Sequence, residues 1–204
     1  MNCSSKRRPL TYAACADTKL AGAARAMSTA PQVVLCPSAA IGSSPSVSLQ
    51  LQQSFGLRRE ESIKFQPRYA DRGDHIALKG SWTKGGRERT VPITTAEQRR
   101  VLDLAHQLAG AGSLIPAHKS YIGQRHTYDG QCKAAGLSNM HGLRHRYAQD
   151  RYEALTGWKA PAAGGPSARS LTPAQRALDA QARQAISREL GHERTQITAV
   201  YLGR

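Results

Sequence analysis

Residues 141–148, HGLRHRYA, open a predicted helix that starts after Ser138-Asn139 and ends near Gly157. Ser and Asn are typical before a first helical turn, and Gly is typical after the last. His141 and Arg144 are three residues apart, so they lie one turn apart on the same helix face. The helix therefore presents an imidazole and a guanidinium side by side.

Helical patterns also occur on both sides of this segment. They rest on apolar residues at helical spacing, on N-cap patterns at Thr94-x-x-Glu97 and Thr172-Pro173, and on a glycine after the last turn. The predicted helices cover residues 47–57 with an end near Gly56, 94–110, 118–135 and 172–190, followed by a short helix capped by Thr195 that carries Ile197, Val200 and Tyr201.

Between residues 62 and 93 the pattern changes to alternation. Residues 62–65, 76–78 and 89–93 alternate apolar and polar side chains, and Gly85-Gly86 can form the turn before the last of them. Pro92 cannot donate to a ladder, which places its strand at an edge. The predicted fold class is α+β: a mainly helical domain with a small antiparallel three-stranded sheet.

The first 46 residues lack sustained periodicity of either kind and contain Pro, Ser and Gly clusters. We predict a disordered or irregular tail over 1–46 and one domain over 47–204, with a Pro/Ala/Gly/Ser linker or insertion at 158–170. An Arg- and Ala-bearing start with few acids also fits a transit peptide, which is the less favoured alternative.

Positive charge dominates the chain, with 29 Lys and Arg against 14 Asp and Glu, a net charge of +15. After residue 50 there are 24 basic and 13 acidic residues, so the excess belongs mainly to the patterned part. This balance predicts a polyanionic partner. On the simplest interpretation, such a chain binds phosphates because binding releases their counterions, and it catalyses no reaction.

The cysteines and the hydropathy exclude several classes of protein. Cys3, Cys15, Cys36 and Cys132 form no C-x-x-C pair, which argues against a disulfide scaffold or a cysteine-type zinc site and favours a reducing, cytoplasmic location. No apolar run approaches the roughly 18 residues that cross a bilayer, so we expect no membrane association.

Phosphodiester transfer needs a nucleophile, a proton acceptor, a proton donor for the leaving oxygen and cations for the non-bridging oxygens. Tyr, His, Lys and paired Arg supply all four, so neither a metal nor a cofactor is required. Taken singly, each candidate also has an ordinary interpretation: Lys84 as a charge at a hairpin tip, His192 as a helix-end residue, Tyr201 as core.

Taken together, the motifs resemble the tyrosine recombinases, or phage integrases, over residues 47–204. They occur in the family's order. The matching stretches are Gly56-Leu57-Arg58-Arg59-Glu60-Glu61, residues 83–93 (TKGGRERTVPI), residues 141–148, Leu190-Gly191-His192, and Tyr201 nine residues after that histidine.

The resemblance implies that Tyr201 attacks the scissile phosphate of double-stranded DNA, forms a 3′-phosphotyrosyl bond and releases a 5′-hydroxyl. His141 would accept the proton of Tyr201, and Lys84 would protonate the leaving 5′-oxygen. Rejoining would need neither ATP nor a metal. Four subunits of such an enzyme assemble on two duplexes, which predicts a homotetramer on DNA.

The same resemblance implies that Arg58 and Arg144 clamp the non-bridging oxygens, with His192 as a further donor and Glu61 in a supporting role. His145 points about 100° away from Arg144 on a helix, so we expect it to pack or contact phosphate outside the reaction centre. The remaining histidines have no recognisable ligand spacing, so we assign them no chemical role: His75, His106, His118 and His126.

Three function hypotheses follow. The first is a site-specific DNA recombinase, either intact or a truncated copy, because the 46 unpatterned residues offer no counterpart of the family's N-terminal helical domain. The second is a non-catalytic DNA-binding remnant of such an enzyme. The third and least favoured is a type IB topoisomerase, which shares the tyrosine chemistry.

Overall fold

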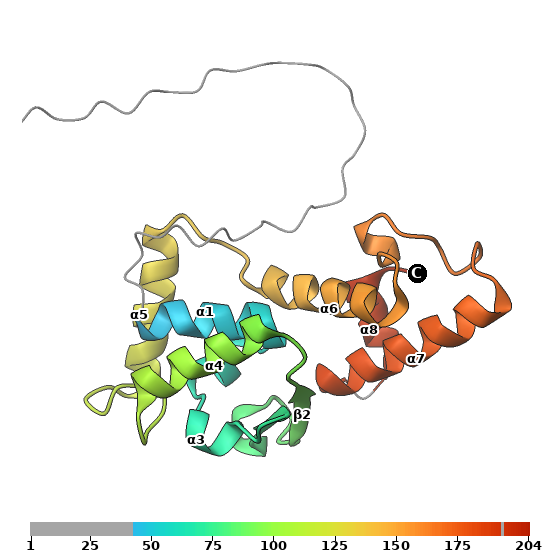
Figure 1. The fold of residues 1–204 in the computed structure, drawn as a ribbon. Coiled ribbons are helices and arrows are strands. Elements are labelled where there is room, and N and C mark those ends of the chain that lie inside the picture. Colours follow the sequence, from blue (N-terminus) through green and yellow to red (C-terminus); the bar gives the residue numbers. More distant parts are fainter. Residues whose placement is uncertain (1–42, 193) are drawn as a thin grey trace, which may run out of the picture.

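The computed structural model describes residues 43–192 and 194–204. Within them the chain forms eight α-helices and one sheet of two strands, with two short 3₁₀ turns (Figure 1). In chain order the elements are α1 Ser44–Phe55, α2 Arg59–Ile63, α3 Pro67–Ala70, β1 His75–Leu78, η1 Gly80–Trp82, β2 Arg89–Pro92, α4 Ala96–Ala109, α5 Tyr121–Ala134, α6 His141–Thr156, η2 Pro161–Ala163, α7 Pro173–Glu189 and α8 Thr195–Leu202. The tail predicted up to residue 46 lies outside the described residues except for 43–46, and α1 already begins at Ser44.

The helix ends follow the signals in the sequence where a cap residue is well defined. α1 ends at Gly56, whose φ of 61° is left-handed, and α6 ends at Gly157 in the same conformation. Thr172 caps α7 by accepting a hydrogen bond from the backbone of Gln175, with Pro173 at the first helical position. The predicted bounds of these helices are confirmed to within a few residues.

Two predicted caps are displaced by one residue. α4 is capped by Thr95 with Gln98, instead of Thr94 with Glu97, because the Gln98 amide oxygen accepts from the backbone N–H of both Thr94 and Thr95. The N-cap position of α8 is Arg194, and Thr195 is already the first residue of the helix.

The predicted third strand at 62–65 is wrong, because this part of the chain ends helix α2. Ser62 donates its backbone N–H to the Arg58 carbonyl and Lys64 donates to that of Glu60, at 3.0 Å each. Glu61 starts this turn by accepting the Arg58 backbone N–H at 2.7 Å. The apolar residues of the alternating pattern, Ile63 and Phe65, are both buried. The pattern therefore came from a buried helix end and not from a strand.

The sheet consists of β1 and β2 alone within the described residues. They pair antiparallel, with Ile76 opposite Val91 and His75 opposite Pro92. Pro92 therefore lies on an edge strand, as predicted. The connection between the strands carries η1 and the Lys84-Gly85-Gly86 turn.

Helix α6 links the two halves of the helical core. It packs against α1 on one side and against α7 and α8 on the other, and β2 also contacts α7 (Figure 1). The segment 158–170, predicted to be a linker, folds back onto this core: Ala160 is buried and η2 contacts α8.

We expect Gly56→Ala to destabilise the protein by about 1–3 kcal/mol, because an L-residue is strained at its φ of 61° and its Cβ would lie 2.5 Å from Tyr147 Cδ1. Urea unfolding measures this loss. Gly157→Ala is the matched control, since Gly157 also ends a helix at positive φ but has nothing within 4 Å of an added Cβ. Equal losses in the two variants would contradict the tight packing of Gly56 on Tyr147.

Candidate active site

Tyr201 of α8 lies across the first turns of α6. Its hydroxyl is 3.2 Å from His141 Nε2, a hydrogen-bond distance. The phenol ring stacks on the His145 imidazole, with centroids 4.3 Å apart, and the His192 ring lies 5.1 Å away. Three imidazoles thus surround the phenol, and one is placed to accept its proton.

His145 was expected to pack or to contact phosphate outside this centre; its ring does pack, but against Tyr201 itself. His145 does point away from Arg144 on α6, but α8 crosses this part of α6. The large Tyr201 ring therefore contacts side chains on both sides of the first turn. The contact depends on the position of α8. The spacing of residues within α6 carries no information about that position.

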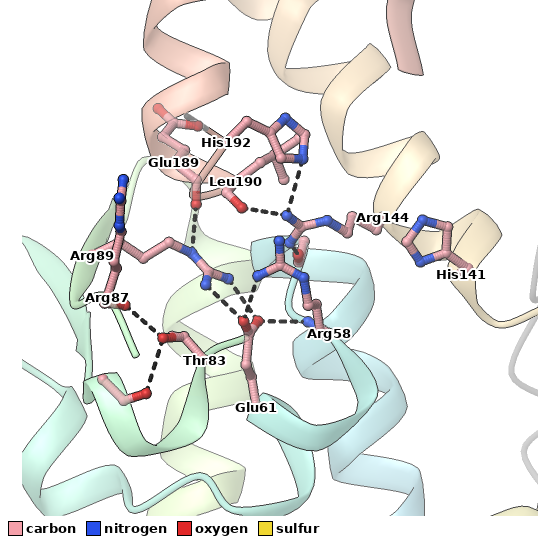
Figure 2. Close-up of polar contacts among 12 residues, drawn as sticks. Arg58, Glu61, Thr83, Arg87, Arg89, His141, Arg144, Glu189, Leu190 and His192 are labelled. Atoms are coloured by element: carbon pink, nitrogen blue, oxygen red, sulfur yellow. Dashed lines mark hydrogen bonds and ion pairs between the residues drawn. The ribbon is translucent and has the colours of Figure 1, made fainter. Parts of the chain in front are cut away.

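Arg144 is almost fully buried, at 1% exposure. Its two terminal nitrogens donate to the main-chain carbonyls of Gly56 and Leu190, so it joins the end of α1 to the end of α7 (Figure 2). Its Nε has no hydrogen-bond partner among the described residues. Burial, and then the charges of Arg58 and Arg89, lower the pKa of Arg144 to about 10, which leaves it cationic at neutral pH.

His192 lies beside Arg144, with Nε2 3.5 Å from Arg144 Nη2. An arginine can only donate, so in this contact Nε2 accepts and the ring proton lies on Nδ1, 3.2 Å from Thr198 Oγ1. Burial, followed by the charges of Arg144, Arg58 and Arg89, lowers the pKa of His192 to about 4. His192 is therefore neutral at pH 7.

Glu61 orders two arginines from different elements (Figure 2). Its carboxylate, with 0% exposed side chain, accepts from Arg58 Nη1 at 2.9 Å and from both terminal nitrogens of Arg89 at 2.7 and 2.6 Å. Burial raises the pKa of Glu61, but the hydrogen bonds and charge of Arg89, together with those of Arg58, outweigh it and bring the pKa to about 2. Glu61 is thus a permanent anion between two cations.

An open cleft of about 800 Å³ lies in front of these groups. Arg58, Lys84, His192 and Tyr201 all line it, and Lys84 is an exposed residue of the connection between β1 and β2. His141 and Arg144 do not line the cleft but contact Tyr201 and His192 directly. The described lining residues include five basic side chains and one acidic side chain, Arg58, Lys84, Arg87, Arg89 and Arg188 against Glu88.

The structure therefore places four candidate residues along one cleft, Arg58, Lys84, His192 and Tyr201. The other three, His141, Arg144 and Glu61, contact members of that group. Arg89 and Thr198 are not among the residues predicted from the sequence. Arg89 had a detectable signal, because it shares a strand face with buried Val91, and arginine on a buried face needs a charged partner. Thr198 had none, since its contact depends on the turn between α7 and α8.

A family model described as Integrase matches residues 14–150. The chain belongs to the integrase family. The matched part of this integrase includes Arg58, Glu61, Lys84, His141 and Arg144, whereas His192 and Tyr201 lie beyond it. The family membership supports an integrase or recombinase role on DNA. None of the curated proteins compared with the chain matches it.

Two further features concern ligands and membranes. Among the described residues no group of three or more His, Cys, Asp or Glu side chains could hold a metal ion. In that same part of the integrase, no helix is both long and apolar enough to cross a bilayer.

The lowered histidine pKa values predict a pH-dependent stability. The unfolded chain binds a proton on His192 below about pH 6.5, whereas the folded chain does so only near pH 4, so stability falls as the pH decreases through this window. His141 and His145, whose pKa values burial also lowers, act in the same direction. Urea midpoints measured at about pH 7.5 and 5.5 should differ in wild type and differ less in His192→Gln. An unchanged difference in that variant would contradict a half-buried, neutral His192.

Proposed function

We propose that this integrase is a site-specific recombinase that breaks and rejoins double-stranded DNA through a 3′-phosphotyrosine at Tyr201. One observation carries the proposal: the Tyr201 hydroxyl is 3.2 Å from His141 Nε2, and Tyr201 lines the same cleft as Arg58, Lys84 and His192. A nucleophile, its base and cationic groups from four separate parts of the chain meet there. Such convergence is the arrangement that phosphodiester transfer requires.

The proton steps balance with the chain's own side chains. The phenol oxygen attacks phosphorus and its proton moves to His141 Nε2, whose lowered pKa keeps the ring neutral and able to accept it. The bond from phosphorus to the 5′-oxygen breaks, and Lys84 supplies a proton to that oxygen. Rejoining is the reverse reaction with a second strand's 5′-hydroxyl as the nucleophile.

The charge on the phosphate oxygens is met by fixed cations. Arg58 is half-buried at the cleft, and Glu61 orients its guanidinium by accepting from Nη1. Arg144 lies directly beside His192 at the edge of the cleft and adds a fixed positive charge there. His192 is neutral and adds no second charge; its Nε2 accepts from Arg144 and so helps to orient that cation. These residues stabilise the transition state without a metal or a cofactor.

The proposed partner is a DNA duplex bound by the basic cleft, with four copies of the chain assembled on two duplexes. The net charge of +15 supports strong phosphate contact. A non-catalytic DNA-binding role is the second candidate. The burial of Arg144 favours it, because both terminal nitrogens are bound to main-chain carbonyls of the protein itself.

A nicked duplex distinguishes the two functions. Cleavage near the nick releases a short fragment, so the reverse reaction cannot occur and a covalent complex accumulates. We expect the wild-type chain to form a protein–DNA complex that survives denaturation, without ATP and in the presence of a chelator. Salt-dependent binding with no covalent complex would overturn the catalytic proposal and support the binding module.

A further inference from the structure

We propose that Arg89 is a positioning residue that fixes the relative positions of three phosphate-facing parts of the site. This inference rests on the proposed function and adds to it a residue on β2 whose guanidinium is held by hydrogen bonds to the protein itself. Arg89 is 9% exposed, and its guanidinium binds a side chain of α2 and a carbonyl at the end of α7. Its own strand continues directly from the segment that carries Lys84.

The first connection runs through Glu61 to Arg58. Arg89 binds Glu61 with a two-pronged fork of 2.7 and 2.6 Å, and Glu61 in turn binds both the backbone N–H and the side chain of Arg58 (Figure 2). The fork fixes both carboxylate oxygens, which leaves Arg58 one defined orientation. Without it, the buried carboxylate would draw Arg58 inward as its remaining ion-pair partner among the described residues.

The second connection runs to the turn that carries His192. Arg89 Nε donates to the Glu189 carbonyl at 2.9 Å, at the last residue of α7. Gly191 has a φ of 66°, and a Cβ there would lie 3.0 Å from Arg89 Cδ. The arginine stem therefore packs directly against the residue before His192, and it sets how closely this turn approaches β2.

The third connection is through the chain itself. Arg89 begins β2, five residues after Lys84, and the turn between them is closed by Thr83 Oγ1 donating to the Arg87 carbonyl at 2.6 Å. Anchoring Arg89 thus anchors one end of the Lys84 segment. A single guanidinium links Arg58, Lys84 and His192, which come from three separate parts of the sequence.

A lysine could supply the charge of Arg89 but not its geometry. Its single ammonium cannot bind both Glu61 oxygens and the Glu189 carbonyl in one plane. The groups that face Glu61 are Arg58 from the start of α2, Arg89 from β2 and, at longer range, Arg144 from α6. Removing Arg89 takes away the largest interaction that lowers the pKa of Glu61, so protonation begins at a higher pH.

The test is single-turnover cleavage of a nicked duplex by the full chain, with duplex affinity measured in parallel. The variants are Arg89→Leu, Arg89→Lys and the matched control Arg99→Lys. Arg99 also bridges a carboxylate and a carbonyl, those of Asp71 and Gly73, but it belongs to α4 and does not line the cleft. Unfolding midpoints identify any loss that comes from stability alone.

We expect Arg89→Leu to lower the single-turnover rate about 100-fold at saturating protein while duplex affinity changes only a few-fold, since misplaced groups affect the transition state most. The fall of the cleavage rate of Arg89→Leu on the acid side should occur at a higher pH than in wild type, and Arg89→Lys should restore part of the rate. A wild type that cleaves, with Arg89 variants no slower than Arg99→Lys, overturns this inference alone. A wild type that forms no covalent product overturns the proposed function and this inference with it.

Discussion

Tyr201→Phe is expected to abolish covalent complex formation, a loss of at least about 10⁴-fold, because the variant lacks the phenol oxygen that attacks phosphorus. The fold should remain, since the hydroxyl makes one hydrogen bond, to His141, and the phenyl ring keeps its stacking on His145. We expect a stability change within about 1 kcal/mol. Single-turnover cleavage of the nicked duplex and urea unfolding measure the two effects.

Duplex affinity is the control for this variant. It should stay close to that of wild type, because the cations of the cleft are untouched. Residual covalent complex in Tyr201→Phe would mean that another residue is the nucleophile. A variant that fails to fold would instead assign Tyr201 to the core.

Arg144→Ala is the change expected to damage both fold and chemistry. It leaves the buried carbonyls of Gly56 and Leu190 without their donor and opens a cavity between α1 and α7. We expect a loss of about 3 kcal/mol or more in the free energy of unfolding, measured in urea. Cleavage should fall by about 10³-fold beyond the folded fraction, because a cation at the phosphate is lost.

Arg144→Lys separates the two roles. Lysine keeps the charge but cannot reach both carbonyls from one ammonium, so it should recover some cleavage and less of the stability. If cleavage by Arg144→Ala, corrected for its folded fraction, equals that of wild type, Arg144 is purely structural. The non-catalytic interpretation would then gain support.

The helical part of the fold was predictable because its signals are local. Caps such as Thr172 and terminal glycines such as Gly157 act within a few residues, and the helices end where they indicate. The alternation at 62–65 misled because four residues are too few to separate a strand from a buried helix end. There the Glu61 side chain, bound to Arg58 and Arg89, decides the conformation.

The motif order singled out residues that the structure places close together: Arg58, Lys84, His192 and Tyr201 line one cleft, and His141 contacts Tyr201. Their role in a reaction stays a prediction. The stacking of His145 on Tyr201 and the role of Arg89 depend on how α8 and β2 pack against distant elements. Such contacts between distant segments are not encoded in spacing along one helix or strand.

The most direct test of a Tyr201 nucleophile is mass spectrometry of the trapped protein–DNA complex after nuclease and trypsin digestion. Cleavage after Arg194 releases residues 195–204, TQITAVYLGR, in which Tyr201 is the only tyrosine. We predict a 3′-linked nucleotide phosphate on this peptide and a free 5′-hydroxyl on the released strand. An adduct on a different peptide, or a phosphate left on the 5′ end, would contradict the account.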